Sequence, residues 1–300
     1  MIKSLVFYLT YPFIYAIASL PFGVLYKVSD IFYHIFYLTG YRKEVVRNNL
    51  RKSFPDKSRD EIEVIVKAYY RYLCDLILET LKTLRMTEAE SRARCTFHNT
   101  AWLDKLYEEK KSFIIVMGHY GNWEWAGPAF TLNTPFQLLV IYRPLSDLHF
   151  EKMMSGMRTK FGTRIAAVNQ TLREMVGNRS KGLVTATAFI ADQTAPRDNA
   201  YWTTFLHQDT AVFTGPEKLA IKFNYPVVYI NVRRPRRGYY DIFPELLFDA
   251  PQNTAEGEIS EAFTKRLEKE IILDPTIWLW SHRRWKHQRK AGTARMTVEI

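Results

Sequence analysis

Four short apolar runs constrain the fold of this chain most strongly. They occupy residues 113–117, 137–142, 183–191 and 227–232. Apolar runs of this length are typical of strands that are buried on both faces of a parallel sheet. Stretches of helical character separate them, at residues 147–161, 172–177 and 217–223. This alternation predicts an α/β fold: a mixed, mostly parallel sheet flanked by helices.

A long amphipathic helix is predicted before the sheet. Ser58 and Glu61 form a capping box just after Pro55. Apolar residues then recur at helical spacing, namely Ile62, Ile65, Tyr69, Leu73 and Leu76. Their stripe indicates core packing, or a contact with the N-terminal segment. We therefore expect a single large domain at 46–300, with a helical lead-in at 46–100 and an α/β core at 101–300.

Polar residues follow the predicted strands at the points where these strands end. They are His119, Arg143, Asp192 and Arg233. In open α/β sheets, ligands bind in the crevice outside the carboxyl ends of the strands. We therefore expect these four side chains to converge on one rim.

The segment GHYGNWE, residues 118–124, follows the first of these strands directly. Gly118 and Gly121 permit a tight turn, and a helix is predicted to begin there. Glu124, in the first turn, could reach back to one ring nitrogen of His119, which would then act as a general base towards an alcohol. The alternative is that His119 only caps a turn and that Glu124 only complements the helix dipole. There is no GxSxG motif and no Cys beside His119, so no acylated residue is needed.

The N-terminal segment is predicted to anchor the chain to a membrane. Residues 4–26 contain no charged side chain, and this segment is long enough to form a spanning helix. Pro12 and Pro21 also allow a bent span or a half-inserted segment, and the aromatic run at 31–41 suits the lipid interface. A cleaved signal peptide is the alternative. The anchor is expected to comprise residues 1–45.

Basic residues follow the apolar segment: Lys27, Arg42, Lys43, Arg47, Arg51 and Lys52. This excess of basic residues predicts that the part of the chain after the apolar segment lies on the cytoplasmic side of the membrane. It also attracts anionic headgroups.

The net charge of +11, from 42 basic and 31 acidic residues, favours a negatively charged partner. Nucleic acid, anionic lipid and a phosphorylated substrate all fit this charge, and the apolar N-terminus favours lipid over nucleic acid. Cys74 and Cys95 stand apart, with no CxxC motif and no His-rich partner, so neither a zinc site nor a disulfide framework is indicated. No metal and no cofactor is expected.

Several short motifs occur in a characteristic order along almost the whole chain. They are Leu20-Pro21 with Tyr26, Asn48-Asn49-Leu50 with Ser53-Phe54-Pro55, Gly118-His119 with Asn122-Trp123-Glu124, Tyr142-Arg143-Pro144, Ala191-Asp192-Gln193, Phe213-Thr214-Gly215, and the segment from Trp280 to Lys286. In these motifs the chain resembles the bacterial lipid A biosynthesis (lauroyl/myristoyl) acyltransferases, within the wider lysophospholipid acyltransferase group.

The resemblance implies that His119 acts as the base with Glu124 as its partner. It implies an acyl-carrier-protein thioester as donor, with acyl-CoA as the lesser option. The implied acceptor is a phosphorylated, acylated glucosamine disaccharide, attacked through a hydroxyl of a 3-hydroxyacyl chain. The expected location is the bacterial inner membrane, with the catalytic domain on the cytoplasmic face.

Further residues are predicted to contact substrate. Arg143 could clamp a phosphate bidentately, or form a structural ion pair. Asp192 could orient His119 or cap the turn before Pro196, and Gln193 could bond to substrate. Asn122, within the motif, and Arg233, on the same rim, are further candidates.

Two segments later in the chain add candidates. Thr214 and Gly215 precede Pro216 at a predicted helix start, whose free N–H groups could bind an anion or an oxyanion, although an ordinary cap fits equally. Arg283 belongs to a cluster that is expected to form an interfacial strip with cations on phosphates, comprising Trp280, Arg283, Arg284, Trp285 and Lys286.

Two other functions stay open. The same chemistry could act on a lysophospholipid, glycolipid or aminolipid acceptor. A noncatalytic membrane lipid binder could also keep this fold. The motifs do not separate the acceptors, whereas the presence of both His119 and Glu124 argues against the binder.

Overall fold

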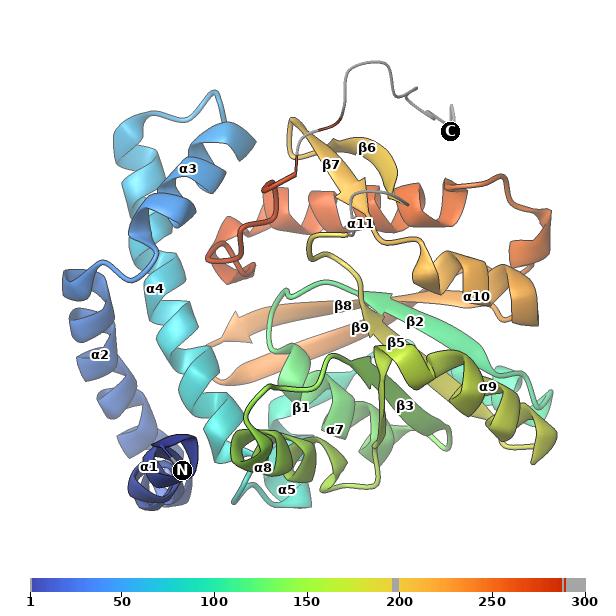
Figure 1. Cartoon of the computed structure of the whole chain (residues 1–300), viewed down its shortest axis with the longest axis horizontal. Helices are drawn as coiled ribbons and strands as arrows, with labels where there is room; N and C mark the ends of the chain where they lie inside the picture. The colour runs from blue at the N-terminus through green and yellow to red at the C-terminus, as the bar shows by residue number, and fades with distance from the viewer. Residues whose placement is uncertain (1, 196–199, 288, 290–300) are drawn as a thin grey trace.

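The computed structural model describes residues 2–195, 200–287 and 289, and shows one sheet with helices on both faces (Figure 1). Pro196, which follows the predicted turn at Asp192, lies outside the described residues. The α-helices are α1 (Ile2–Ser19), α2 (Phe22–Thr39), α3 (Lys43–Ser53), α4 (Arg59–Lys82), α5 (Glu88–Arg94), α6 (Ala101–Glu108), α7 (Trp123–Asn133), α8 (Leu148–Thr159), α9 (Thr171–Ser180), α10 (Gly215–Phe223) and α11 (Glu258–Leu273).

The strands are β1 (Cys95–Phe97), β2 (Phe113–Met117), β3 (Gln137–Tyr142), β4 (Arg164–Ala167), β5 (Thr185–Ile190), β6 (Tyr201–Phe205), β7 (Gln208–Val212), β8 (Val227–Arg236) and β9 (Tyr239–Phe248). Seven of them form one sheet in the order β1-β9-β8-β2-β5-β3-β4, and β6 and β7 form a separate antiparallel hairpin. Only β8 and β9 pair antiparallel within the large sheet. The predicted mixed, mostly parallel α/β sheet is thus confirmed.

The predicted strands and crossover helices are present, with shifted ends. β5 is shorter than the run 183–191, and β8 continues beyond 232 to Arg236. Strands β1, β4, β6, β7 and β9 were not predicted. Most of them are short or carry polar residues. β9 alternates buried and half-buried positions along its first half and includes Pro244. Such segments lack the continuous apolar character of a fully buried strand.

The sheet separates two apolar layers. On one face, β2, β5 and β8 pack against α4, α10 and α11. On the other, the same strands pack against α6 and α7. Figure 1 shows α11 crossing one side of the sheet and α7 lying on the opposite side. Because helices cover both faces, the functional side chains are left to the ends of the strands.

The helix α4 begins at the predicted capping box. The Ser58 hydroxyl accepts a hydrogen bond from the Glu61 amide, and the Glu61 carboxylate accepts one from the Ser58 amide. α1 and α2, blue in Figure 1, lie beside α4. The Lys82 ammonium donates to the carbonyl of Leu20, between these two helices, at 2.8 Å. The division of the chain at residue 45 stays a prediction.

The uncharged N-terminal run forms two helices instead of one. Pro12 lies inside α1, and Pro21 stands at the start of α2 as its N-cap. Within the described part of the chain, no helix has both the length and the apolar character that crossing a bilayer requires. The spanning reading of this segment is therefore not supported.

Large apolar side chains are nevertheless exposed along both N-terminal helices. They are Leu5, Val6, Tyr8, Leu9, Phe13 and Tyr15 on α1, and Val24, Ile31, Ile35 and Leu38 on α2. Of the basic residues that follow, Arg47 forms ion pairs with Glu44 and Glu63, and Arg42 donates to the carbonyl of Ser281. These two cations therefore stabilise the fold, whereas Lys27, Arg51 and Lys52 are exposed.

Candidate functional site

The pairing of β2 with β5 brings His119 and Asp192 together. Met117, the last residue of β2, is opposite Ile190, the last residue of β5, in a parallel register. His119 and Asp192 each lie two residues beyond these paired positions. Because parallel strands end at the same edge, the two side chains meet at the rim of the sheet.

The carboxylate of Asp192 holds His119 by two hydrogen bonds. The backbone amide of His119 donates to Oδ2 at 2.8 Å, and Nδ1 of its ring lies 2.5 Å from Oδ1. Burial would raise the pKa of Asp192, but the charge of His119 and the hydrogen bonds from His119 and Trp278 outweigh it and lower that pKa. The ionised carboxylate therefore assigns the proton to Nδ1 and leaves Nε2 as the basic nitrogen.

Trp278 completes the surroundings of this pair. Its indole Nε1 donates to Oδ2 of Asp192 at 2.8 Å, and the neighbouring amide of Leu279 donates to the carbonyl of His119. Trp123 packs edge-on against the imidazole, with 4.9 Å between ring centroids. Sequence reasoning missed the contact with Trp278, which lies two residues before the closing segment that begins at Trp280.

Glu124 does not hold the His119 ring in this structure. Its carboxylate forms a bidentate ion pair with Arg158 of α8, at 3.0 Å from Nε and 2.6 Å from Nη2. Among the described residues, no hydrogen bond joins Glu124 to His119. In this structure Asp192, and not Glu124, lies at the ring nitrogen Nδ1, and Glu124 ties the start of α7 to α8. The catalytic role of Glu124 stays a prediction.

Gln193 lies next to the free nitrogen of the imidazole. Its side-chain amide nitrogen is 3.2 Å from Nε2 of His119, and the side chain is exposed. In that orientation the amide donates to the lone pair of Nε2. An alcohol that approaches this nitrogen would have to displace Gln193. The structure thus brings Gln193 to the predicted site.

The turn after His119 is closely packed. Gly121 has a φ of +61°, and a Cβ there would meet the carbonyl oxygen and Cγ1 of Val232 at 2.7 Å. Asn122 is fully buried: its Oδ1 accepts from the amide of Trp125, and its Nδ2 donates to Glu79. Asn122 was predicted to contact substrate. Because both of its side-chain polar groups are occupied inside the protein, it instead caps α7 and supports the turn.

The structure does not join the other predicted rim residues to His119. Arg143 follows β3 and is exposed, with no hydrogen bond or ion pair to any described residue. Arg233 lies inside β8, because that strand is longer than predicted, and its guanidinium is 3.8 Å from Glu270 and lies over Phe243.

Thr214 and Gly215 lie at the start of α10, as predicted, but Thr214 makes no side-chain cap. The Glu217 carboxylate in that first turn accepts from the amides of Gly257 and Ser260. The first turn of α10 is thereby tied to the start of α11. Among the described residues, no hydrogen bond or ion pair links this helix start to His119, so its role as an anion site stays a prediction.

The closing aromatic and basic segment is mostly internal. Trp280 is fully buried, and the indole of Trp285 donates to the Thr210 hydroxyl at 2.7 Å. Arg284 is buried as well, and burial lowers its pKa to about 10. Only Arg283 and Lys286 of this cluster are exposed. The expectation of one interfacial strip is therefore wrong for Trp280 and for Arg284, whereas Trp285 is half-buried.

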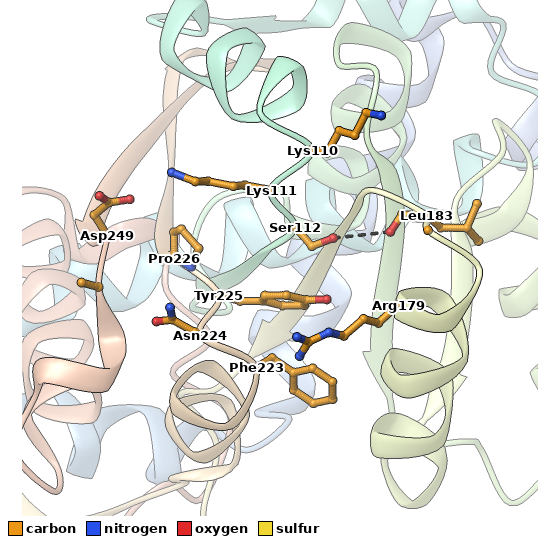
Figure 2. Close-up of a pocket in the computed structure, with 12 residues that line it drawn as sticks. Lys110, Lys111, Ser112, Arg179, Leu183, Phe223, Asn224, Tyr225, Pro226 and Asp249 are labelled. Atoms are coloured by element: carbon orange, nitrogen blue, oxygen red, sulfur yellow. Dashed lines mark hydrogen bonds between the residues drawn. The ribbon is translucent and has the colours of Figure 1, made fainter.

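A cavity of about 540 Å³ lies at the other edge of the sheet (Figure 2). Ser112, Leu183 and Pro226 line it, and these residues precede β2, β5 and β8. It is therefore at the opposite ends of the strands from His119 and does not belong to the site. In residues 2–195, 200–287 and 289, no group of His, Cys, Asp and Glu side chains is arranged to hold a metal ion.

Comparison with known proteins identifies relatives over nearly the whole chain. The family described as bacterial lipid A biosynthesis acyltransferase matches residues 1–287. The chain is 26% identical to the lipid A biosynthesis palmitoleoyltransferase of Escherichia coli (strain K12), over 82% of this chain and 79% of that protein. It is 24% identical to a lipid A biosynthesis acyltransferase of Haemophilus influenzae, over 90% of this chain and 87% of that protein.

Proposed function

Because this chain belongs to the bacterial lipid A biosynthesis acyltransferase family and is an acyltransferase, we propose that it transfers a fatty acyl chain from a thioester to a hydroxyl of a lipid A precursor. In this proposal His119 is the general base. Asp192 orients its imidazole, and Glu124 acts through its ion pair with Arg158.

The observation that carries this proposal is the pair of His119 and Asp192. The carboxylate on Nδ1 fixes the ring tautomer and stabilises the imidazolium that forms during the reaction. The imidazole side chain is 15% exposed and that of Asp192 is 3% exposed, so the ring can be reached while its partner stays shielded from water. This combination suits a base that must contact an external alcohol.

The reaction is balanced without an acylated residue. Nε2 of His119 takes the proton of the acceptor hydroxyl while the oxygen attacks the thioester carbonyl carbon. A C–O bond forms and the C–S bond breaks. The departing thiolate receives the proton from the imidazolium, so an ester and a free thiol are the products. Gln193, which lies beside Nε2, would yield its place to the hydroxyl.

The substrates are proposed from the family and from charge. An acyl-carrier-protein thioester is the expected donor, with acyl-CoA as the alternative, and the acceptor is a phosphorylated, acylated glucosamine disaccharide. The exposed Arg143 and Arg283 are candidates for binding phosphate, since a guanidinium can bind two phosphate oxygens at once. The net charge of +11 favours such anionic partners.

We also propose that the enzyme works at the inner membrane, with the catalytic domain on its cytoplasmic face. The exposed apolar side chains of α1 and α2 support this location, since a helix with such a face can lie in the lipid interface. Lys27, Arg51 and Lys52 are exposed cations that would favour anionic headgroups.

Mass spectrometry of lipids tests the acceptor and the base together. Cells that lack the gene are compared with cells that carry the wild-type gene or a His119→Ala variant. Absence of one acyl chain from lipid A, restored by the wild type alone, is the expected result. Loss confined to a lysophospholipid, glycolipid or aminolipid would favour that acceptor. Complementation by His119→Ala would contradict the proposed base and favour a lipid binder.

A further inference from the structure

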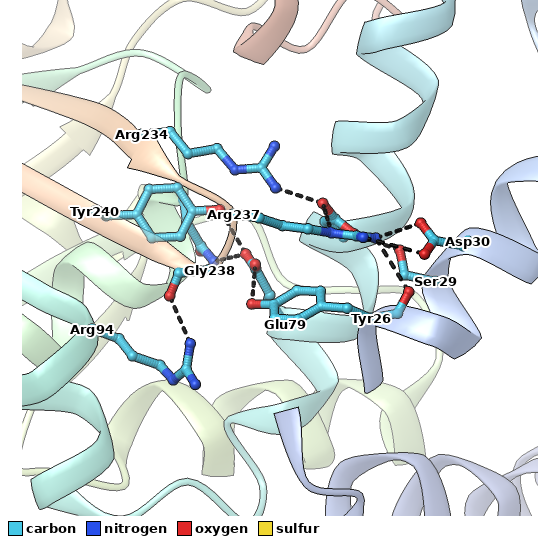
Figure 3. Close-up of polar contacts among 11 residues, drawn as sticks. Tyr26, Ser29, Asp30, Glu79, Arg94, Arg234, Arg237, Gly238 and Tyr240 are labelled. Atoms are coloured by element: carbon cyan, nitrogen blue, oxygen red, sulfur yellow. Dashed lines mark hydrogen bonds and ion pairs between the residues drawn. The ribbon is translucent and has the colours of Figure 1, made fainter. Parts of the chain in front are cut away.

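Glu79, on α4, joins three separate elements inside the protein. It is fully buried, and its carboxylate accepts hydrogen bonds from the hydroxyl of Tyr26 at 2.8 Å, the hydroxyl of Tyr240 at 2.6 Å and Nδ2 of Asn122 at 2.8 Å. Figure 3 shows the rings of Tyr26 and Tyr240 directed at Glu79 from different elements. These residues come from α2, β9 and the turn after His119, so one side chain connects all three.

The contact with Asn122 acts on the candidate site. Asn122 uses its other side-chain atom, Oδ1, to cap α7 at the amide of Trp125. The indole of Trp125 in turn donates to the backbone carbonyl of Glu79 at 2.9 Å. Two turns earlier on α4, the Tyr72 hydroxyl donates to the carbonyl of Gly121 at 2.6 Å. α4 therefore holds the segment from Gly121 to Trp125 at three points.

The opposite side of this network holds α2. Besides Tyr26, Ser29 of α2 donates to Asp75 at 2.6 Å, and Asp75 lies one turn before Glu79 on α4. Arg237 bridges Asp75 and Asp30 of α2 (Figure 3). Polar contacts thus fix the position and rotation of α2 on α4, because hydrogen bonds require a specific geometry.

This arrangement is a costly way to attach a helix. Burial raises the pKa of Glu79, while the bond from Tyr240 and the charge of Arg234 oppose that rise. An apolar side chain at this position would avoid the desolvation of a carboxyl group. It would, however, leave Asn122 and Tyr240 without an acceptor, and unpaired buried donors are unfavourable. The carboxylate is therefore suited to positioning its three donors.

We propose that Glu79 is a positioning residue for acyl transfer. Through Asn122 it fixes the conformation of the turn after His119, and through Tyr26 it links that turn to the position of α2 on α4. The inference rests on the proposed function, since it takes His119 as the base. In this proposal α2 and the active-site turn move together. α2 also bears part of the exposed apolar surface. A displaced α2 would then misplace the turn.

Hydrogen–deuterium exchange of the full-length protein in detergent micelles tests the coupling without any substrate. Tyr26→Phe removes one hydroxyl at α2. It is expected to raise the exchange rate of amides in residues 119–126 by about 10-fold, as the loss of one buried hydrogen bond predicts. Tyr70→Phe is the matched control, because the Tyr70 hydroxyl donates to the carbonyl of Tyr41 and does not contact the turn. Equal exchange in both variants would overturn the proposal.

Steady-state kinetics provide the second measurement, with dodecanoyl-acyl carrier protein and an acylated, bis-phosphorylated glucosamine disaccharide as probes. Tyr26→Phe and Glu79→Ala are expected to lower kcat with little change in KM. Glu79→Gln is expected to keep most activity, because its amide oxygen still accepts from Asn122 and the Tyr26 hydroxyl can rotate to accept. Loss of thermal stability in Tyr26→Phe with unchanged kcat and unchanged exchange at 119–126 would reduce Glu79 to a structural role. Failure of the proposed base would instead show as transfer by His119→Ala, with the exchange result unaffected.

Discussion

The backbone amide and the ring nitrogen Nδ1 of His119 both bind the carboxylate of Asp192, one to each oxygen. Residues that are 73 positions apart in the chain thus share one rim of the sheet. This contact selects the ring nitrogen that is free to act as a base, and it makes Asp192 the first residue to test.

Asp192→Asn is expected to lower kcat by about 10²- to 10⁴-fold with a small change in KM. The amide keeps the size of the carboxylate but no longer favours the proton on Nδ1, and a similar change in the serine protease triad costs about 10⁴-fold. Steady-state kinetics of the purified variant measure this. Wild-type kcat in Asp192→Asn would remove Asp192 from the mechanism.

Glu124→Gln and Arg158→Met are each expected to destabilise the protein by about 3 kcal/mol, since each leaves one partner of a largely buried ion pair uncompensated. In the double variant, the free energy of unfolding is expected to fall by less than the sum of the two single decreases, with a difference of at least about 1 kcal/mol. Urea unfolding measures all three free energies. The control is Arg164→Met, which breaks the more exposed pair with Glu174 and is expected to cost about 1 kcal/mol or less.

The same two variants also distinguish the roles of Glu124. If Glu124 acts through Arg158, both single variants lose kcat to a similar extent. Loss of activity in Glu124→Gln with full activity in Arg158→Met would instead favour a direct role of the Glu124 carboxylate.

Gly121→Ala is expected to destabilise the protein by about 2–4 kcal/mol and to reduce kcat. A left-handed backbone disfavours a Cβ by about 1–2 kcal/mol, and the contact with Val232 adds an overpacking cost of about 1–3 kcal/mol. Gly156→Ala in α8 is the control. No atom lies within 4 Å of its added Cβ, so a gain of about 0.5–1 kcal/mol is expected from helix propensity. Similar melting temperatures for both variants would contradict this account.

His282 is expected to make the fold less stable in acid. Burial lowers its pKa to about 4 from an ordinary value of 6.5, with Asp192 opposing and Arg284, Lys286 and His119 adding to the decrease. The unfolded chain therefore binds more protons than the folded one between these values. The stability that depends on neutral His282 is fully present above about pH 6.5, and it is lost as the pH decreases towards 4.

Because His282 is only half-buried, we expect the loss between pH 6.5 and 4 to be about 1–2 kcal/mol after allowance for solvent screening. Urea unfolding at several pH values measures it. His282→Gln should make the profile flatter by that amount, and an unchanged profile would show that other groups cause the acid sensitivity.

Leu9→Glu and Phe13→Glu on α1 are expected to weaken binding to vesicles that contain anionic lipid by about 10-fold or more each. The two side chains are 62% and 72% exposed, and burial of such a side chain in lipid contributes about 1.5–3 kcal/mol. Vesicle flotation measures the bound fraction. Leu273→Glu, at the exposed end of α11, is the control, and an equal effect there would argue against α1 as the lipid-facing surface.

The sequence predicted the sheet correctly for physical reasons. It also placed His119 and Asp192 on one rim, and it left both Glu124 and Asp192 open as partners of the imidazole. Strands buried on both faces need continuous apolar runs, so β2, β3, β5 and β8 could be recognised locally. The turn at Gly118 and Gly121 and the helix after it could also be recognised, as could the capping box of α4. Strands such as β9, whose burial depends on their neighbours in the sheet, could not.

The partner of His119 was decided by tertiary structure. Glu124 is close to His119 in sequence, but the direction of α7 turns its carboxylate to Arg158 of α8. Asp192 reaches the ring because β5, instead of β3, lies next to β2. The amino-acid sequence by itself determined which residues can form strands, caps and a basic nitrogen. Only strand order and helix packing decided which of them meet, because those depend on contacts between distant segments that no local pattern encodes.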